Sequence, residues 1–346
     1  MDPFARTILD WYAQFARDLP WRRTRDPYAV WLSEIILQQT RIAQGTAYWQ
    51  RFMERFPTVE QLSQASEDEV LRLWEGLGYY SRARNLHAAA RQIVVLGGFP
   101  QTLEGIRQLK GVGDYTAAAI GSICFGLPAA VVDGNVYRVL ARYYGIATPV
   151  GTTAAKKEFT ALANRLLPPQ EAAAFNQGMM DFGALQCTPQ NPDCEACPLF
   201  SGCNARKTGR VGILPVKKPA TTIQERRFDY IYLRFQGQTA IRKRPAGDIW
   251  QGLYEPVVVS TEKTSVDSLA SDNYFSQGFA KNQFSDAQLI RKGVRHQLTH
   301  RTLIADFYIW EPSQKPELPE GYFWIKEAEL DRYAKPRLFE LLLEAI

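Results

Sequence analysis

The chain has 346 residues, of which 46% are apolar and 12% aromatic, and its 41 basic and 36 acidic side chains give a net charge of +5. At roughly 150 residues per domain this length predicts two domains, and the apolar fraction excludes a disordered chain. No run approaches the ~18 apolar residues of a membrane span, and the N-terminus lacks the apolar core of a secretion signal. We therefore expect a cytoplasmic protein without membrane association, nucleoid-associated if bacterial, whose mild charge permits a polyanionic partner.

Residues 1–205 are predicted to be helical. Phe4, Ile8, Tyr12, Phe15 and Leu19 have the three- and four-residue spacing of one buried helical face. Similar spacing predicts helices over Val30–Phe56, Val70–Leu77, Ala83–Leu96, Tyr115–Phe125, Val136–Tyr144, Lys156–Leu167 and Ala172–Leu185. Turns rich in Gly and Pro separate these segments, and no fixed repeat is present.

The amino-acid composition changes at Arg206, where Lys, Arg, Gly, Pro and Thr become frequent and the regular spacing of apolar residues ends. Residues 206–227 are therefore predicted to be a linker. Phe228–Phe235 and Thr239–Lys243 flank a Gln-Gly-Gln turn and predict a β-hairpin. Thr302–Trp310 predicts another strand and Pro336–Ile346 a closing helix. The predicted fold is multidomain, with an all-α domain over 1–205 and an α+β domain over 228–346.

Four of the five cysteines lie close together, as Cys187, Cys194, Cys197 and Cys203 in the spacing C-x6-C-x2-C-x5-C. Four thiolates can enclose a tetrahedral zinc or a cubane iron–sulfur cluster. Zinc sites usually have two C-x2-C pairs with a longer spacer, whereas this compact loop has one. We predict one 4Fe–4S cluster, with zinc as the alternative, and take Cys124 to be a buried, inert thiol.

A second motif, Leu109–Ala117, places Gly111 and Gly113 between two helical segments. Glycine permits positive φ and a close approach of the backbone, and a helix N-terminus offers free N–H groups. A DNA phosphate would fit there. The signal is weak by itself, because many helix turns contain two glycines.

Together these pieces resemble the endonuclease III superfamily of DNA glycosylases. Further motifs narrow the resemblance to the MutY-type adenine DNA glycosylases. The motifs that narrow it are Leu19–Arg22, Trp31–Thr40 and Gly76–Tyr80, whereas Leu109–Thr116 and Val131–Val136 carry the resemblance to the superfamily. Trp250–Glu255 and Arg295–His300 resemble the C-terminal domain of those enzymes. The resemblance spans essentially the whole chain. It implies a helix-hairpin-helix glycosylase domain with an iron–sulfur loop, followed by a MutT-like (Nudix-fold) domain. The implied partner is double-stranded DNA with adenine opposite 8-oxoguanine or guanine, bound by a monomer.

Glu34 is the candidate general acid. It lies mid-helix in an apolar context, where burial raises the pKa of a carboxyl group and retains its proton near neutrality. Without the resemblance, an exposed helical glutamate would be the better interpretation. The resemblance implies that Glu34 protonates adenine N7, which turns the base into a neutral leaving group.

Asp133 is the candidate anion. It precedes a helix whose N–H groups would hold it ionised, facing the oxocarbenium ion that develops on the sugar. A plain helix N-cap is the alternative role. The resemblance implies assistance from Tyr115 and Asn135, and it leaves open whether Asp133 forms a covalent bond or an ion pair.

The resemblance also implies the residues that handle the extruded base and its partner. Gln38, Gln39 and Tyr79 are candidate wedges, although Tyr79 is equally compatible with a core position. Trp21, Arg22 and Gln177 are expected to line the adenine pocket. Thr40, Leu77, Leu298, Thr299 and His300 are expected to examine 8-oxoguanine. Leu298 stands where the family usually has Phe, which removes a stacking ring.

Tyr115 stands where bifunctional relatives have the lysine that forms a Schiff base, so we predict base removal without efficient strand cleavage. The second domain lacks the acidic Nudix box, so we expect recognition there and no pyrophosphate hydrolysis. The alternatives are a thymine-glycol-type glycosylase and lyase, and a non-catalytic iron–sulfur protein that binds DNA or senses redox state.

Overall fold

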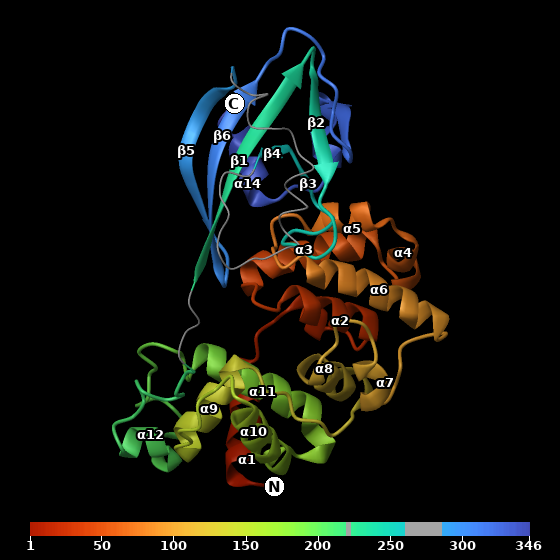
Figure 1. Ribbon diagram of the computed structural model, residues 1–346. Helices are drawn as coiled ribbons and strands as arrows, with labels where there is room; N and C mark the ends of the chain where they lie inside the picture. Colours follow the sequence, from red (N-terminus) through yellow and green to blue (C-terminus); the bar gives the residue numbers. More distant parts are fainter. Residues whose placement is uncertain (219–222, 260–285) are drawn as a thin grey trace. The chain divides into compact units, whose positions relative to one another are not determined.

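The computed structural model describes residues 1–218, 223–259 and 286–346. Contacts divide the chain into two units (Figure 1). The first comprises Met1–Gln64 and Asn85–Pro219, and the second comprises Ala65–Arg84 and Ala220–Ile346. Within the described ranges, no helix has the length and apolar character needed to cross a membrane. The prediction of a helical region followed by an α+β region is confirmed.

Helices account for nearly all regular structure up to residue 218. They are α1 (Pro3–Phe15), η1 (Pro20–Arg22), α2 (Pro27–Ile36), α3 (Ile42–Arg55), α4 (Val59–Gln64), α5 (Glu67–Trp74), α6 (Ser81–Val95), α7 (Leu103–Arg107), α8 (Asp114–Phe125), α9 (Gly134–Tyr144), α10 (Thr153–Leu166), η2 (Pro169–Glu171), α11 (Ala172–Leu185), η3 (Phe200–Gly202) and α12 (Asn204–Lys207). A core of buried side chains joins α1, α8, α9, α10 and α11, with Phe159, Phe175 and Phe182 among its largest members.

The helix predicted over Val30–Phe56 is in fact two helices, α2 and α3. The chain turns between Leu37 and Arg41, and Gln39 adopts a φ of 56°, in the left-handed region. No glycine or proline marks this turn, and the apolar spacing continues through it, so the sequence pattern gave no break. The turn places polar side chains at the end of α2.

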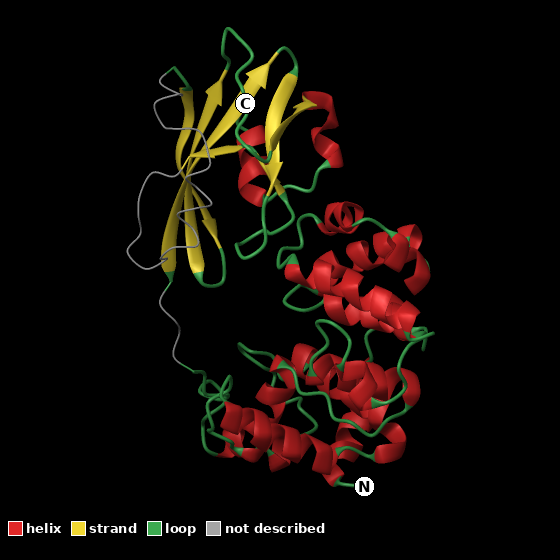
Figure 2. Cartoon of the chain, turned by 45° about the vertical axis from the view of Figure 1, so that its right-hand side comes forward, coloured by secondary structure: helices red, strands yellow, loops and turns green. Residues whose placement is uncertain are grey.

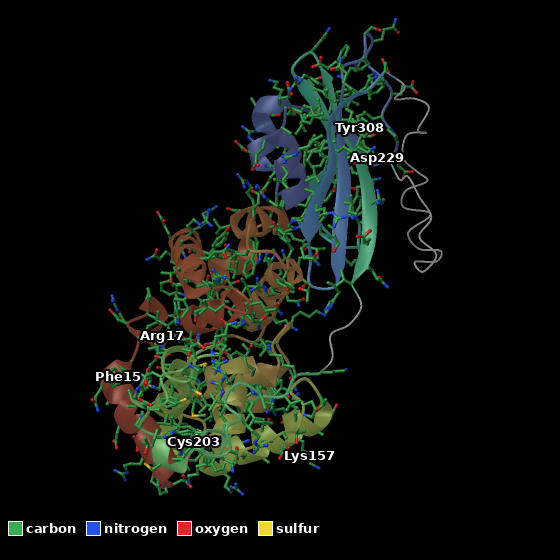
Figure 3. All side chains as sticks on the ribbon, turned by 90° about the vertical axis from the view of Figure 1, so that its left-hand side faces the viewer. Phe15, Arg17, Lys157, Cys203, Asp229 and Tyr308 are labelled. Atoms are coloured by element: carbon green, nitrogen blue, oxygen red, sulfur yellow. The ribbon has the colours of Figure 1, made fainter. Side chains whose placement is uncertain are left out.

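The first helix is shorter than the predicted stripe. α1 ends at Phe15, and Leu19 lies outside it because it precedes Pro20, whose ring disfavours helical backbone one residue earlier. Phe15 was predicted to be buried, but it is 53% exposed and stacks on Trp11 at the end of the helix (Figure 3).

The second unit contains a mixed sheet. Its strands are β1 (Gln224–Phe235), β2 (Gln238–Lys243), β3 (Tyr254–Glu255), β4 (Val257–Val259), β5 (Gln288–Gln297), β6 (Arg301–Trp310) and β7 (Tyr322–Lys326). The order is β3-β2-β1-β6-β5, with β4 also paired to β1 and β7 to β2. β1 and β6 run parallel, and the other pairs are antiparallel. The short helices η5 (Glu327–Arg332) and α14 (Arg337–Leu343) follow the last strand of this unit (Figure 2).

Alternation along β1 builds the core on both faces of this sheet. Phe228, Tyr230 and Tyr232 pack in one cluster with side chains of α14, whereas Ile231 and Leu233 pack in another. This is the period of two expected for a strand that is buried on both sides. The predicted hairpin is confirmed, because Gln236 and Gly237 both have positive φ and connect β1 to β2.

The observed division of the chain differs from the predicted domain boundaries. Ala65–Arg84, which contains α5, groups with the sheet although the prediction placed it in the helical domain. The predicted linker 206–227 also holds the end of α12 and the start of β1 at Gln224. Apolar spacing predicts the helix itself but does not show which distant segment it packs against. The first residues of β1 are charged and mostly exposed, so their composition resembles that of the linker and does not predict a strand.

Candidate active site

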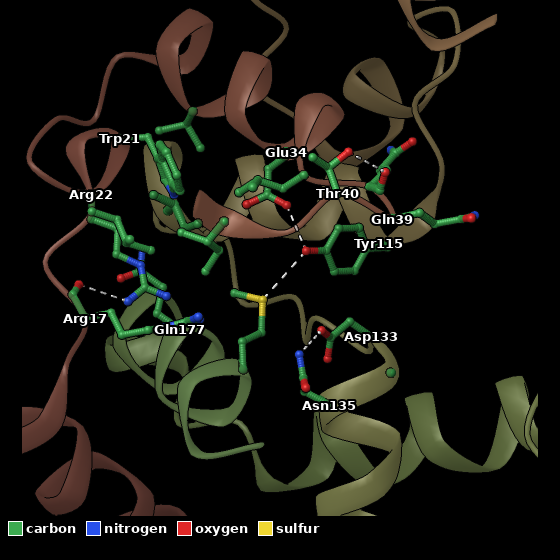
Figure 4. Close-up of a pocket in the computed structure, with 18 of the residues that line it drawn as sticks. Arg17, Trp21, Arg22, Glu34, Gln39, Thr40, Tyr115, Asp133, Asn135 and Gln177 are labelled. Atoms are coloured by element: carbon green, nitrogen blue, oxygen red, sulfur yellow. Dashed lines mark hydrogen bonds between the residues drawn. The ribbon is translucent and has the colours of Figure 1, made fainter. Parts of the chain in front are cut away.

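A cavity of about 540 Å³ lies in the first unit and is lined by residues of η1, α2, the 37–41 turn, α8, α9 and α11 (Figure 4). Ten of the predicted site residues line it: Trp21, Arg22, Glu34, Gln38, Gln39, Thr40, Tyr115, Asp133, Asn135 and Gln177. Segments up to 156 residues apart in the chain, from Trp21 to Gln177, therefore meet around one space. Its volume lies within the range of small-molecule sites.

Glu34 projects from α2 into this cavity and is only 8% exposed. Burial raises the pKa of its carboxyl group to about 7, and the nearby charge of Asp133 acts in the same direction. A hydrogen bond from the Tyr115 hydroxyl to Glu34 Oε2, at 2.8 Å, and the charge of Arg22 oppose this rise. A carboxylic acid with this pKa holds its proton in a large fraction of molecules at neutral pH, as a general acid requires.

Asp133 caps the N-terminus of α9 and faces the same cavity. Its Oδ1 accepts the backbone N–H of Val136 at 2.8 Å, and its Oδ2 accepts the side-chain amide of Asn135 at 2.8 Å. Burial nevertheless raises the pKa of Asp133, with these hydrogen bonds opposing it. We expected the helix terminus to dominate and lower the pKa. The loss of water around the carboxylate outweighs it.

Tyr115 connects the acid to the opposite wall. It is the second residue of α8, and its hydroxyl also lies 3.6 Å from the sulfur of Met180 on α11. Burial raises the pKa of Tyr115 well above its usual value, and the charges of Glu34 and Asp133 add to this. The hydroxyl therefore stays protonated and donates to Glu34.

Arg22 and Gln177 form a polar wall with Trp21 in the cavity. Arg22 donates both terminal nitrogens to the carboxylate of Asp181, at 2.6 and 2.7 Å. Asp181 is fully buried and also accepts from the side chain of Arg17. Sequence reasoning missed Arg17 and Asp181. The signal was the acidic Asp181 inside the apolar stretch of α11, since a buried carboxylate needs paired charges.

The three candidate residues of the 37–41 turn differ in exposure. Gln38 and Thr40 are half-buried, whereas Gln39 is exposed at the rim. The side-chain amide of Gln38 lies 3.4 Å from the hydroxyl of Thr116 on α8. The left-handed backbone of Gln39 therefore presents a polar side chain beside the cavity without burying it.

The remaining base-handling candidates lie in the second unit. Leu77, Tyr79, Leu298, Thr299 and His300 line a cavity of about 730 Å³ there. The hydroxyls of Tyr79 and Thr299 are hydrogen-bonded. Tyr79 has a φ of 47° and is 46% exposed, so it is not a core residue. Trp250 and His296, which the sequence analysis did not select, line the same cavity with their rings 6.0 Å apart.

The two glycines of the hairpin differ in their surroundings. Gly111 has a φ of 75°, and a Cβ there would come 2.7 Å from the Cβ of Asn85, so the fold alone explains this glycine. Gly113 is the N-cap of α8, makes no side-chain cap, and has open space where a Cβ would point. Only Gly113 therefore combines a helix N-terminus with an open approach.

The four clustered cysteines lie in one short loop. All are half-buried in the loop between α11 and α12, and the thiols of Cys187, Cys194 and Cys203 act electrostatically on Cys197. Burial and these neighbours raise the pKa of Cys197 to about 11, so joint deprotonation requires a cationic partner. In the described part of the chain, no three metal-binding side chains converge tightly enough for a single ion. Four thiols in one short loop are the kind of donor set that a four-iron cluster takes.

Two buried arginines of α9 fasten the cysteine loop. Arg142 donates to the sulfur of Cys187 at 3.4 Å and to the carbonyl of Thr188 at 2.7 Å. Arg138 donates to the carbonyl of Cys187 at 2.7 Å and to Asn135 Oδ1 at 2.8 Å. Since Asn135 in turn donates to Asp133, a continuous chain of hydrogen bonds runs from the cysteine loop to the cavity.

Cys124 lies apart from this loop, in α8. It is half-buried, and burial raises the pKa of its thiol to about 12. A thiol that stays protonated is a poor nucleophile and a poor metal ligand, as expected for an inert cysteine.

Comparison with known proteins identifies the family. The adenine DNA glycosylase of Buchnera aphidicola subsp. Schizaphis graminum is 37% identical over 254 residues, which cover 72% of this chain and 73% of that protein. The chain belongs to the adenine DNA glycosylases. The human adenine DNA glycosylase is 47% identical over 215 residues, 59% of this chain, although these span only 39% of the human protein. The adenine DNA glycosylase of Schizosaccharomyces pombe is 28% identical and matches 96% of this chain.

Three family descriptions match segments of this adenine DNA glycosylase. Residues 32–169 match the HhH-GPD superfamily of base excision DNA repair proteins, and residues 230–345 match the NUDIX domain. Residues 187–203, which begin and end at cysteines, match the iron–sulfur binding domain of endonuclease III. The predicted 4Fe–4S cofactor is thereby supported over zinc.

Solved structures show the same fold for the helical part of this glycosylase. A thermostable thymine-DNA glycosylase superposes with a TM-score of 0.55 at 33% identity, over 59% of this chain and 95% of that one. A trapped covalent intermediate of endonuclease III with DNA superposes with a TM-score of 0.52 at 23% identity, over 59% of this chain and 94% of that one. The second similarity shows the fold alone.

Proposed function

We propose that this adenine DNA glycosylase hydrolyses the bond between adenine and deoxyribose in duplex DNA, with adenine mispaired to 8-oxoguanine or guanine. One observation carries the proposal. Glu34 and Asp133, two carboxyl groups with raised pKa values, face one cavity that admits a nucleobase. Paired carboxyl groups with different surroundings are the usual machinery for cleaving a glycosidic bond.

Glu34 supplies the proton. Its pKa of about 7 lets the side chain carry a proton into the cavity at neutral pH. Transfer of that proton to adenine N7 makes the departing base neutral, which lowers the barrier for breaking the bond. The Tyr115 hydroxyl holds the other end of the carboxyl group in place while the proton moves.

Asp133 stabilises the sugar. As the base departs, positive charge develops on the sugar ring, and this charge favours the anionic form of a nearby carboxylate. The hydrogen bonds from Asn135 and from the start of α9 hold both oxygens in position. Covalent attack by Asp133 and ion pairing both use this placement.

The chemistry ends at base removal. The residues that line the cavity include two arginines but no lysine, so the lining lacks an amine that forms a Schiff base. Tyr115 stands at the position where bifunctional relatives are expected to have the lysine, and its neutral phenol donates a hydrogen bond to Glu34. Efficient strand cleavage therefore requires a group that this lining does not supply.

DNA is held at several places in this proposal. The open N-terminus of α8 at Gly113 binds a phosphate of the DNA backbone. Gln38 and Gln39 act as wedges in the space that the extruded adenine leaves in the stack of bases. In the second unit, the exposed Tyr79 and its partner Thr299 examine the base opposite adenine. We propose that the protein binds its duplex as a monomer.

The test is excision from duplexes that place adenine opposite 8-oxoguanine, opposite guanine or opposite thymine. We expect cleaved strands only after hot alkali, with rates that fall in that order. Asp133→Asn keeps a helix-capping side chain and should bind the lesion duplex yet release no adenine. Strand cleavage without alkali would contradict the monofunctional mechanism, and undiminished release by Asp133→Asn would exclude its role.

A further inference from the structure

The wall of the cavity opposite Glu34 has an unusual hydrogen-bond character. Arg22 has only donors, and its guanidinium is held by Asp181. Gln177 carries both an acceptor and donors, so the orientation of its amide decides what the wall offers. The hydroxyl of Tyr12 donates to Gln177 Oε1 at 2.5 Å and thereby fixes the orientation of the amide. With Oε1 turned toward Tyr12, the NH₂ group is the end of the Gln177 amide that is left to face a ligand.

Tyr12 itself does not line the cavity and had no assigned role. It lies on α1, and it reaches Gln177 because the next residue on α11 is a glycine. A Cβ at Gly178 would lie 3.1 Å from Tyr12 Cβ, 3.3 Å from Tyr12 Cγ and 3.1 Å from Ile8 Cγ2. Burial also raises the pKa of Tyr12, so its hydroxyl keeps the proton that it donates.

We propose that Tyr12 is a positioning residue that fixes the amide of Gln177 so that the wall presents donors alone, which selects adenine over guanine. This inference rests on the proposed function. When N7 of a purine faces Glu34, the six-membered ring points away from it, toward the opposite side of the cavity. There both purines offer the acceptor N3, but adenine adds the acceptor N1, whereas guanine carries N1–H and a 2-amino group, which a donor-only wall repels.

The first experiment removes the hydroxyl and nothing else. Tyr12→Phe frees the Gln177 amide to rotate, and we expect single-turnover release of adenine to slow about fivefold to tenfold, the worth of one hydrogen bond. Affinity for the duplex should stay within about twofold, because Tyr12 lies behind the wall. The matched control is Tyr144→Phe, a half-buried tyrosine of α9 that packs on Phe4 and does not line the cavity.

The second experiment identifies what the wall reads. Duplexes carrying 1-deazaadenine or 3-deazaadenine opposite 8-oxoguanine replace one ring acceptor by C–H. The natural chain should process one of the two analogues far more slowly than adenine, and this penalty should largely disappear in Tyr12→Phe. Gly178→Ala displaces Tyr12 and leaves its hydroxyl in place. This variant should show the same reduced difference in rate between adenine and the analogue as Tyr12→Phe.

The outcomes distinguish a failure of the proposed function from a failure of the role assigned to Tyr12. Failure of the natural chain to release adenine would overturn the proposed function and the inference with it. Normal release with Tyr12→Phe equal to Tyr144→Phe would overturn only the role of Tyr12. Equal slowing of adenine and both analogues by Tyr12→Phe would also overturn it, because a general loosening of the fold has no preference for one ring nitrogen.

Discussion

The two carboxyl groups of the cavity show how position sets acidity. Glu34 lies in the middle of a buried helix and receives one hydrogen bond, from Tyr115. Asp133 lies at a helix end and receives bonds from the backbone and from Asn135. Burial raises both pKa values, to about 7 for Glu34, and the hydrogen bonds that each carboxyl group receives oppose the rise.

Tyr115→Phe is predicted to shift the pH dependence of base release upward. The hydroxyl stabilises the charged form of Glu34 and so lowers the pKa of this carboxyl group. Without it the pKa rises above about 7, and the decline of the single-turnover rate on the alkaline side should move to higher pH. Tyr137→Phe, on α9 outside the cavity, serves as the control. A shift toward lower pH would contradict the assignment.

Glu34→Gln is predicted to stabilise the protein while abolishing catalysis. The folded-state pKa of about 7 exceeds the ordinary 4.5, so the folded state binds more protons between these values. Stability therefore falls as pH rises through this window, by about 3 kcal/mol in total, and the neutral amide escapes the loss. Denaturant unfolding should show the gain at pH 8 and little difference at pH 4. An equal gain at both pH values would rule out this cause.

Some cavity residues are visible in the sequence and others are not. Glu34 and Asp133 follow from motif resemblance, since an acid in an apolar helix and an acid before a helix are ambiguous alone. Tyr12 counted as part of an apolar stripe, because a phenol that reaches a glutamine 165 residues later leaves no local signal. Spacing shows which face of α1 is buried, but it does not show which polar atoms meet there.

At the scale of elements, the crossing of α9 and α11 positions the anion. Gly183 on α11 faces the first turn of α9, and a Cβ there would lie 2.6 Å from the Cβ of Asn135 and 3.1 Å from its Cα. Arg138 bonds to the carbonyl of Gly183 and to Asn135 across the same contact. The two helices therefore approach closely where Asp133 is held.

Gly183→Ala is predicted to impair both stability and base release. The added methyl group meets backbone atoms, which cannot move aside cheaply, so we expect a loss of about 1–3 kcal/mol of stability. The single-turnover rate should fall with it, because α9 must shift and carries Asp133. Gly212→Ala is the matched control, since a Cβ there meets open space. A variant with full activity would show that the crossing does not set the position of Asp133.

Two features that the sequence analysis missed have separate physical causes. β5 is an edge strand whose residues are mostly exposed on both faces, so it lacks the alternation that predicts strands. The break between α2 and α3 depends on a left-handed Gln39, which no glycine announces. By contrast, α11 was predicted with its observed bounds, because its apolar positions and its flanking prolines agree.

For the molecule as a whole, the second unit depends on a short segment borrowed from the helical half of the chain. Glu75 accepts the backbone N–H of Lys335 at 2.8 Å, and its side chain is only 9% exposed. Asp68 pairs with Lys243 at 2.5 Å, but it is 45% exposed. The two acids make similar contacts in different surroundings.

Burial, and not the number of ion pairs, should decide what each acid contributes. We predict that Glu75→Ala lowers the stability of the second unit by about 2–3 kcal/mol, because it leaves the backbone N–H of Lys335 without its acceptor and the buried Lys335 ammonium without the carboxylate 3.8 Å away. Asp68→Ala should cost less than about 1 kcal/mol, since water screens an exposed pair. Thermal unfolding of both variants provides the comparison, and equal losses would contradict the argument.

The buried arginines have a consequence for how the protein meets nucleic acid. Arg138 and Arg142 donate hydrogen bonds to the cysteine loop, and Arg242 and Arg244 form ion pairs with the buried Glu255. A duplex therefore encounters fewer cations than the 41 basic residues suggest. Because a buried, paired arginine displaces no counterion from DNA, these four side chains add nothing to the salt-dependent part of the affinity.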